Sequence, residues 1–204
     1  MKPALRKLLV AAIFFVASAA VNAASVTLLN VANSENRGGF YAGFYTLSVD
    51  NQILPGMCDD FSTNSTIGET WNANILTYSD IVAGGGKFGP NLVKYSQIGW
   101  LYSLAGAATS SQQASINEAV WKVMTPGAPA LSGDALAYFN SATDTARDTF
   151  DFSGVMRILE PLPHSASQEF LIPIGSQVVP VPAAVWLLGS GLLTLAGLRR
   201  NSRR

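Results

Sequence analysis

The fold is decided by residues 91–105, which read Asn-Leu-Val-Lys-Tyr-Ser-Gln-Ile-Gly-Trp-Leu-Tyr-Ser-Leu-Ala. Their apolar side chains recur three or four residues apart, the spacing of one face of an α-helix: Leu92, Tyr95, Ile98, Leu101 and Tyr102. The stretches before this point alternate as strands do. The chain therefore changes from strands to helices here, which predicts an α+β fold.

Two more helices are expected after this one. Ser110 or Ser111 can cap a helix that ends before Thr125, because the following Pro126 disfavours helical backbone at the preceding residue. Ser132-Gly133-Asp134 then opens a third helical stretch over 135–141.

Strand patterns flank these helices on both sides. Residues 25–31 and 41–49 alternate or are rich in aromatic and β-branched side chains, and Asp50-Asn51 is a turn signal before Ile53-Leu54. Residues 71–76, 155–159 and 169–174 are further short strands. The sequence predicts a β-rich domain with a helical insertion, flanked by an N-terminal signal helix and a C-terminal transmembrane helix.

Both ends of the chain have the pattern of targeting segments. Lys2, Arg6 and Lys7 precede an apolar run over 8–17, and Val21-Asn22-Ala23 offers a signal-peptidase site, so residues 1–23 are expected to be removed on export. At the other end an apolar run over 183–198 is followed by arginines. This run would form a short membrane-spanning helix with its basic end in the cytoplasm.

The tail, residues 178–204, combines Pro180-Val181-Pro182, the apolar run and the arginine cluster that begins at Arg199-Arg200. It resembles a PEP-CTERM sorting segment of the Val-Pro-x-Pro variant, with Val181 where the name-giving motif has Glu. The resemblance implies processing by an exosortase in a Gram-negative bacterium that makes exopolysaccharide. The expected partners are signal peptidase, this exosortase-type enzyme, the inner membrane and an exopolysaccharide or other surface ligand.

The body between the two ends, residues 24–177, is acidic. It holds six basic residues against all thirteen acidic ones. Because nucleic-acid binding needs a basic surface, no nucleic-acid partner is expected. Cys58 is the only cysteine, so no internal disulfide can form and the core must be held by burial alone.

Two stretches of the body carry a further pattern, together with residues 95–101. Met57-Cys58-Asp59-Asp60 follows a strand, and residues 114–121, Ala-Ser-Ile-Asn-Glu-Ala-Val-Trp, lie on the second helix. The pattern resembles the thioester domains of bacterial surface adhesins. In those domains a cysteine joins a glutamine four residues before a tryptophan, and the resulting thioester captures a nucleophile.

In this chain Cys58 matches the cysteine and Trp121 the tryptophan, but the residue four before Trp121 is Asn117. Asparagine is one methylene shorter, so its amide carbon would stand about 1.5 Å from the position that glutamine reaches. A thioester at Cys58 would require the backbone to move. The other interpretation is that the fold is kept and Cys58 is a small buried apolar residue.

Other chemistry is sparse. His164 is the only histidine and is expected in a surface loop, so a catalytic triad has little to build on. Asp59 and Asp60 are expected in a solvated acidic turn, and Gly84-Gly85-Gly86-Lys87 in a flexible turn. We predict no catalytic residue, no metal site and no cofactor.

The sequence thus predicts a non-enzymatic exported protein of the cell surface or extracellular matrix, sorted by an exosortase-type system and associated with exopolysaccharide or biofilm. The alternative is a covalent surface adhesin with an internal thioester at Cys58.

Overall fold

The structure, a computed structural model, describes residues 23–175. The predicted signal peptide up to residue 22 and the whole predicted sorting segment, 178–204, lie outside the described residues. This holds for the predicted span 183–198 and for the sorting-motif residues Pro180, Val181, Pro182, Arg199 and Arg200. In the part of the chain that is described, no helix has the length and apolar character needed to cross a membrane.

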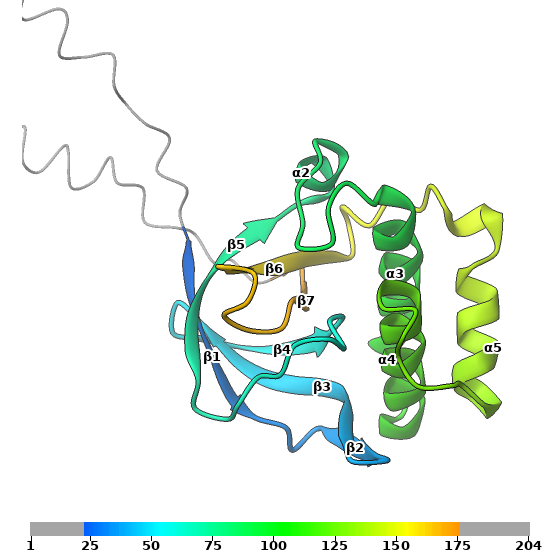
Figure 1. Cartoon of the computed structure of the whole chain (residues 1–204), viewed down its shortest axis with the longest axis horizontal. Helices are drawn as coiled ribbons and strands as arrows, with labels where there is room; N and C mark the ends of the chain where they lie inside the picture. The colour runs from blue at the N-terminus through cyan, green and yellow to red at the C-terminus, as the bar shows by residue number, and fades with distance from the viewer. Residues whose placement is uncertain (1–22, 176–204) are drawn as a thin grey trace, which may run out of the picture. The chain divides into compact units, whose positions relative to one another are not determined.

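Six strands close into an antiparallel barrel (Figure 1). The described residues form seven strands in all: β1 (Ala24–Asn30), β2 (Ser34–Arg37), β3 (Phe40–Val49), β4 (Gln52–Cys58), β5 (Thr70–Leu76), β6 (Met156–Leu162) and β7 (Phe170–Pro173). The six in the barrel follow the order β1-β5-β6-β7-β4-β3, and β3 pairs back with β1 to complete the ring. The short β2 pairs with the first part of β3.

Alternating side chains explain why these segments are strands. In β1 the side chains of Ala24, Val26 and Leu28 are buried, and the residues between them are more exposed. The turn between β3 and β4 is made by Asp50 and Asn51, which both have positive φ, at 47° and 68°. This turn suits the right-handed twist of a tight hairpin, and Asp and Asn tolerate its left-handed backbone.

The helical insertion lies between β5 and β6, as the sequence predicts. It contains α2 (Tyr78–Val82), α3 (Leu92–Ala105), α4 (Ser110–Met124), α5 (Gly133–Ala142) and the 3-10 turn η2 (Thr145–Arg147). Helices α3, α4 and α5 gather on one side of the barrel, with α5 outermost (Figure 1). The cap of α4 is Thr109, not Ser110 or Ser111, and it forms a reciprocal capping box with Gln112.

Two buried apolar clusters fill the domain. One lies between the helices and strands β6 and β7, and includes Tyr95, Ile98, Phe152 and Ile158. The other is formed mainly by barrel strands and includes Leu47, Cys58, Trp71, Phe170 and, from helix α4, Trp121. Helix α4 contributes side chains to both clusters, so it fixes the helical insertion against the barrel.

The structure adds two elements to those that the sequence predicts and extends a third. The polar residues 33–39 contain a strand, β2, and helix α2 follows strand β5. Strand β6 continues to Leu162, beyond the predicted end at residue 159. These elements are short or polar, so periodicity gives little signal for them.

Candidate functional site

The three residues of the expected thioester pattern lie together in the interior. Cys58 ends strand β4, and Asn117 and Trp121 stand one turn apart on α4. Cys58 and Asn117 are fully buried and Trp121 is 4% exposed. The Asn117 Nδ2 donates a hydrogen bond of 2.6 Å to the backbone carbonyl of Cys58.

The second half of the Asn117 amide is also engaged. Its Oδ1 accepts a hydrogen bond of 2.9 Å from the buried backbone N–H of Gly43 in strand β3. Asn117 therefore ties α4 to β3 and to the end of β4. A buried amide with both ends paired has the geometry of a structural clamp.

The Cys58 thiol points into a closed environment. Its Sγ donates to the backbone carbonyl of Asp60 at 3.2 Å. Burial raises the pKa of the thiol well above its ordinary value, and the charges of Asp59 and Asp60 raise it further. The Trp121 indole and the Asp60 backbone act in the opposite direction. Because the thiolate is the nucleophilic form, this thiol is held in its unreactive state.

Two neighbours of Cys58, Asp59 and Asp60, are fully buried, which corrects the expectation of a solvated turn. Asp60 is paired with Lys87, whose Nζ lies 2.5 Å from Asp60 Oδ2 and whose side chain is 10% exposed. Asp60 Oδ1 accepts from the backbone N–H and hydroxyl of Ser62. Burial alone would raise the pKa of Asp60, but the hydrogen bonds from Lys87 and Ser62 hold it below its ordinary value.

Asp59 faces a second buried acid, Glu169, beside strand β7. Glu169 accepts a hydrogen bond of 2.7 Å from the Tyr95 hydroxyl and one of 3.1 Å from the Lys87 backbone N–H. Among the described residues, no group donates a hydrogen bond to either carboxyl oxygen of Asp59. Burial, followed by the charge of Glu169, raises the pKa of Asp59 well above its ordinary value.

The burial of these polar groups could be predicted only in part from the sequence. Glu169 begins an otherwise apolar strand pattern, which indicates a buried acid. Lys87 follows three glycines and has no such signal. The Gly84–Lys87 segment is packed, not free: a side chain at Gly86 would meet the Tyr95 hydroxyl at 2.5 Å. The described residues contain no group of three or more His, Cys, Asp or Glu side chains suited to hold a metal ion.

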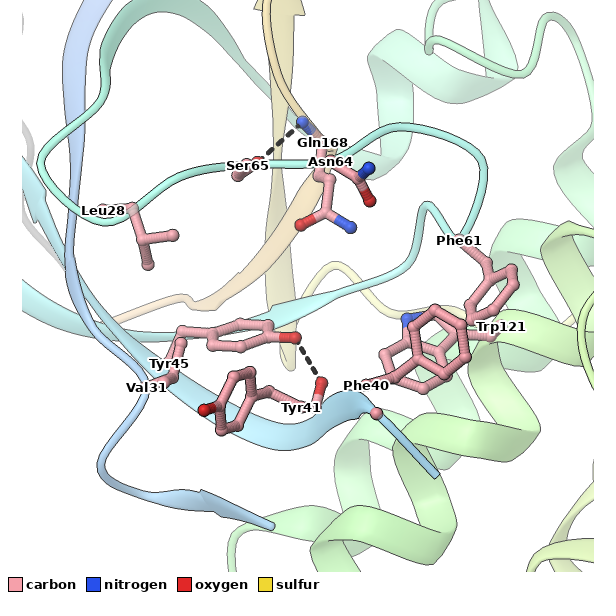
Figure 2. A pocket seen from close by; sticks show the side chains of 11 residues that line it. Leu28, Val31, Phe40, Tyr41, Tyr45, Phe61, Asn64, Ser65, Trp121 and Gln168 are labelled. Carbon is pink, nitrogen blue, oxygen red and sulfur yellow. Dashed lines mark hydrogen bonds between the residues drawn. The ribbon is translucent and has the colours of Figure 1, made fainter. Parts of the chain in front are cut away.

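A surface pocket of about 150 Å³ lies beside Trp121 (Figure 2). Asn64 and Gln168 lie on one side of it, and the rings of Tyr41 and Tyr45 lie on the opposite side. Phe61 connects the pocket to the interior, because its ring packs against Trp121 with centroids 5.3 Å apart. This pocket is the open part of the site, and no pattern along the chain predicts it. His164, by contrast, is half exposed in a loop, as expected.

No protein-family model matches this chain, and no curated protein matches it. Among solved structures, it is similar to the N-terminal thioester domain of a surface protein from Clostridium perfringens, with 14% identity and a TM-score of 0.45 over 74% of this chain and 97% of that chain. A likeness at this level says nothing about function, so the function is inferred from the residues of the site.

Proposed function

We propose that this chain is a non-enzymatic exported protein of the cell surface or extracellular matrix, whose barrel domain binds a ligand without covalent chemistry. The observation that carries the proposal is the contrast between the two halves of the site. Cys58, Asp59, Asp60 and Glu169 are enclosed, and all but Asp59 have hydrogen-bonded side chains, while the pocket beside them is open and lined mainly by rings, aliphatic side chains and amides. Such a lining suits recognition of a ligand, and the residues that form it include hydroxyl groups but no His, Asp, Glu or Lys side chain that could activate them.

Delivery to the surface rests on the two terminal segments. Residues 1–23 have the pattern of a signal peptide, and residues 178–204 resemble a PEP-CTERM sorting segment. The proposal includes sorting of the tail by an exosortase-type enzyme and association of the body with exopolysaccharide or biofilm outside the cell.

The location can be tested in the bacterium that makes the protein. Mass spectrometry of the surface and matrix fractions should find an N-terminus near Ala24. Replacing both tail prolines, Pro180→Ala with Pro182→Ala, should reduce the surface-associated fraction. Two exposed prolines of the body, Pro126→Ala with Pro129→Ala, are the matched control. Protein found only in the cytoplasm with Met1 intact would overturn the proposal.

A covalent adhesin is the second candidate, favoured by the contact between the Asn117 amide and Cys58. In that reaction the Cys58 sulfur would attack the Asn117 amide carbon. A carbon–sulfur bond would form, the carbon–nitrogen bond would break, and the nitrogen would take up the thiol proton and leave as ammonia. The raised pKa of the thiol and the two hydrogen bonds of the amide both oppose the reaction.

Intact mass separates the two candidates. We expect the untreated chain to have its full mass and to be unchanged by methylamine. A mass lower by one ammonia, raised by the mass of one methylamine on treatment and absent from a Cys58→Ala variant, would establish the covalent adhesin instead. Asn117→Gln is an informative companion, since it supplies the missing methylene at the same position.

A further inference from the structure

The pocket beside Trp121 has a lining that selects for uncharged ligands. The described residues that form it contribute no Asp, Glu, Lys or Arg side chain. A charged ligand entering it would lose hydration without meeting an opposite charge, and an unpaired charge is costly to desolvate. The domain as a whole is acidic, so this neutral surface is a local feature.

Aromatic rings form one part of the pocket. Phe40 and Tyr41, at the start of strand β3, are 45% and 47% exposed. Phe40 packs on Phe61 with ring centroids 4.7 Å apart, and Phe61 packs in turn on the buried Trp121. Phe40 is thus held in place by a chain of rings that ends in the core. Large exposed rings with fixed positions provide apolar contact area at little cost in conformational entropy.

Polar groups form the opposite part. The Asn64 side chain is exposed at the pocket, and Gln168 lies beside it (Figure 2). Gln168 is fixed by two hydrogen bonds, from its Nε2 to the Asp60 carbonyl at 2.9 Å and from its backbone N–H to Ser65 Oγ at 3.1 Å. Each carboxamide can donate and accept, so neighbouring hydroxyl groups of one ligand can pair with a single side chain.

Size restricts the ligand further. At about 150 Å³ the pocket is smaller than the range of roughly 300–1,000 Å³ usual for drug-sized ligands. It has room for one small ring. It is also open at the surface, so the rest of a longer ligand can continue outside it.

We propose that this pocket binds a neutral pyranose ring within a saccharide. A pyranose has an apolar face of C–H groups that suits the rings, hydroxyl groups at its rim that suit the amides, and no charge. A peptide of similar size would bring backbone groups in place of a hydroxylated rim, and an acidic sugar would bring a carboxylate that finds no cation here. The inference rests on the proposed function, because it names the ligand class of the same site.

The test measures binding of neutral and acidic oligosaccharides to the purified mature chain by titration calorimetry. The neutral probes are gluco-, galacto- and manno-oligosaccharides, and the acidic probe is an oligogalacturonate. We expect binding of at least one neutral probe and none of the acidic probe. Affinity electrophoresis in gels holding either the bacterium's own matrix polysaccharide or a glycoprotein then distinguishes the two sources of such a ring.

Two variants locate the binding. Phe40→Ala should weaken it roughly tenfold, through loss of ring contact. Asn64→Ala should weaken it about three- to tenfold, through loss of hydrogen bonds to an uncharged ligand. The matched controls are Ile53→Ala, at an apolar residue that is 71% exposed on β4, and Asn72→Ala, at an exposed position of β5. Both controls should leave the affinity unchanged.

The inference is overturned if no neutral probe binds, if the acidic probe binds as well, if an uncharged peptide competes for the pocket, or if the pocket variants bind like the controls. These outcomes do not depend on where the protein is found in the cell. A surface protein without saccharide binding would retain the proposed location and lose this ligand, whereas a cytoplasmic protein that binds saccharide would do the reverse.

Discussion

Asn117 shows how one side chain can decide what a site does. A glutamine at this position would carry its amide carbon farther from the helix, toward the cysteine. The shorter amide fits between the Gly43 N–H and the Cys58 carbonyl, and both of its ends are paired. The residue type therefore favours a structural bridge between β3, β4 and α4.

We predict that Asn117→Ala lowers the free energy of unfolding by about 2–4 kcal/mol, because it leaves a buried N–H and a buried carbonyl unpaired. Urea denaturation followed by far-ultraviolet circular dichroism measures the change. Asn72→Ala, at an exposed strand position, is the control and should change stability by less than about 0.5 kcal/mol. Equal losses in both variants would mean that the clamp contributes nothing.

Asp59 is the residue at which pH should act. Its pKa is raised in the folded state, so the folded chain holds a proton that the unfolded chain releases. Stability should then fall as the pH rises above the ordinary carboxyl value near 3.8, by up to about 1.4 kcal/mol per pH unit, until the raised pKa is passed. Asp60, with its lowered pKa, acts the other way and loses its contribution only as the pH falls into the acid range.

Thermal unfolding between pH 4 and 9 tests this. In Asp59→Asn the stability should fall less steeply with rising pH, because the amide does not titrate. A smaller fall should remain, because the pKa of Glu169 is also raised. Asp134→Asn, at an exposed position on α5, should follow the unmodified protein. A decline of the same steepness in Asp59→Asn would show that this carboxyl is ionised in the folded state.

At the scale of elements, helix α3 is placed by a close approach at Gly99. A side chain there would meet the Phe152 Cβ at 2.6 Å, within a cluster that is fully packed. Gly106, which caps the same helix, has φ −64° and ψ −30° and nothing within 4 Å of an added Cβ. The two glycines thus differ in packing while both have helical backbone.

We predict that Gly99→Ala destabilises the protein by about 1–2 kcal/mol, since overpacking outweighs the gain of about 1 kcal/mol in helix propensity. Gly106→Ala should be neutral or stabilising by up to about 1 kcal/mol. Unfolding midpoints in urea measure both. If Gly99→Ala were the more stable variant, the contact with Phe152 would have to be looser than it is here.

Lys87 joins three connecting segments. Its ammonium group pairs with Asp60, donates to the Thr63 hydroxyl at 2.9 Å and donates to the Ser167 carbonyl at 3.0 Å. The loop after β4, the loop before α3 and the loop before β7 are held together by this one charge. Removing it leaves the Asp60 carboxylate buried without its cation.

We predict that Lys87→Met costs about 3–5 kcal/mol of stability, as expected for a broken buried ion pair. Adding Asp60→Asn should recover part of the loss, because the uncompensated charge is then removed. Lys122→Met is the control, since the Lys122 amine donates only to two backbone carbonyls. Strictly additive losses in the double variant would show that the two groups are not coupled.

Strong periodicity made the longer elements predictable. Helices α3 and α4 and strand β3 match their expected ranges to within about a turn or a residue, because each has many apolar positions at regular spacing. The short α2 and the polar β2 lack that spacing. Barrel closure through the β1–β3 pairing also has no local signature, since the two strands pair across a register set by the whole sheet.

At the scale of the whole molecule, some residues of the site could be predicted from local sequence patterns and others could not. Cys58, Asn117 and Trp121 could be singled out from spacing along the chain. The pairs Asp60 with Lys87 and Asp59 with Glu169 join residues far apart in sequence, and the pocket brings together five separate segments. Burial of those acids follows from tertiary packing, which residue type alone does not reveal.

We predict that the body is stable without its tail. The body has two buried apolar clusters of its own, and the sequence predicts that residues 178–204 form a sorting segment with a membrane span, so a chain ending at residue 177 should unfold at the same urea concentration as one that retains 178–204. The paired comparison of midpoints, with the tail-bearing chain in mild detergent and the same detergent added to the other, measures this. A clear drop on truncation would assign the tail a part in folding.

The closed ring of strands also affects how copies of this protein can associate with one another. Proteins that meet at high local concentration can associate by adding strand to strand along unpaired backbone. In the described part of the chain the barrel joins β1 to β3, so the ring has no terminal strand, and the added β2 is only four residues long and carries Glu35 and Arg37. Many copies could therefore lie side by side without templating fibres, and their contacts would be left to side chains.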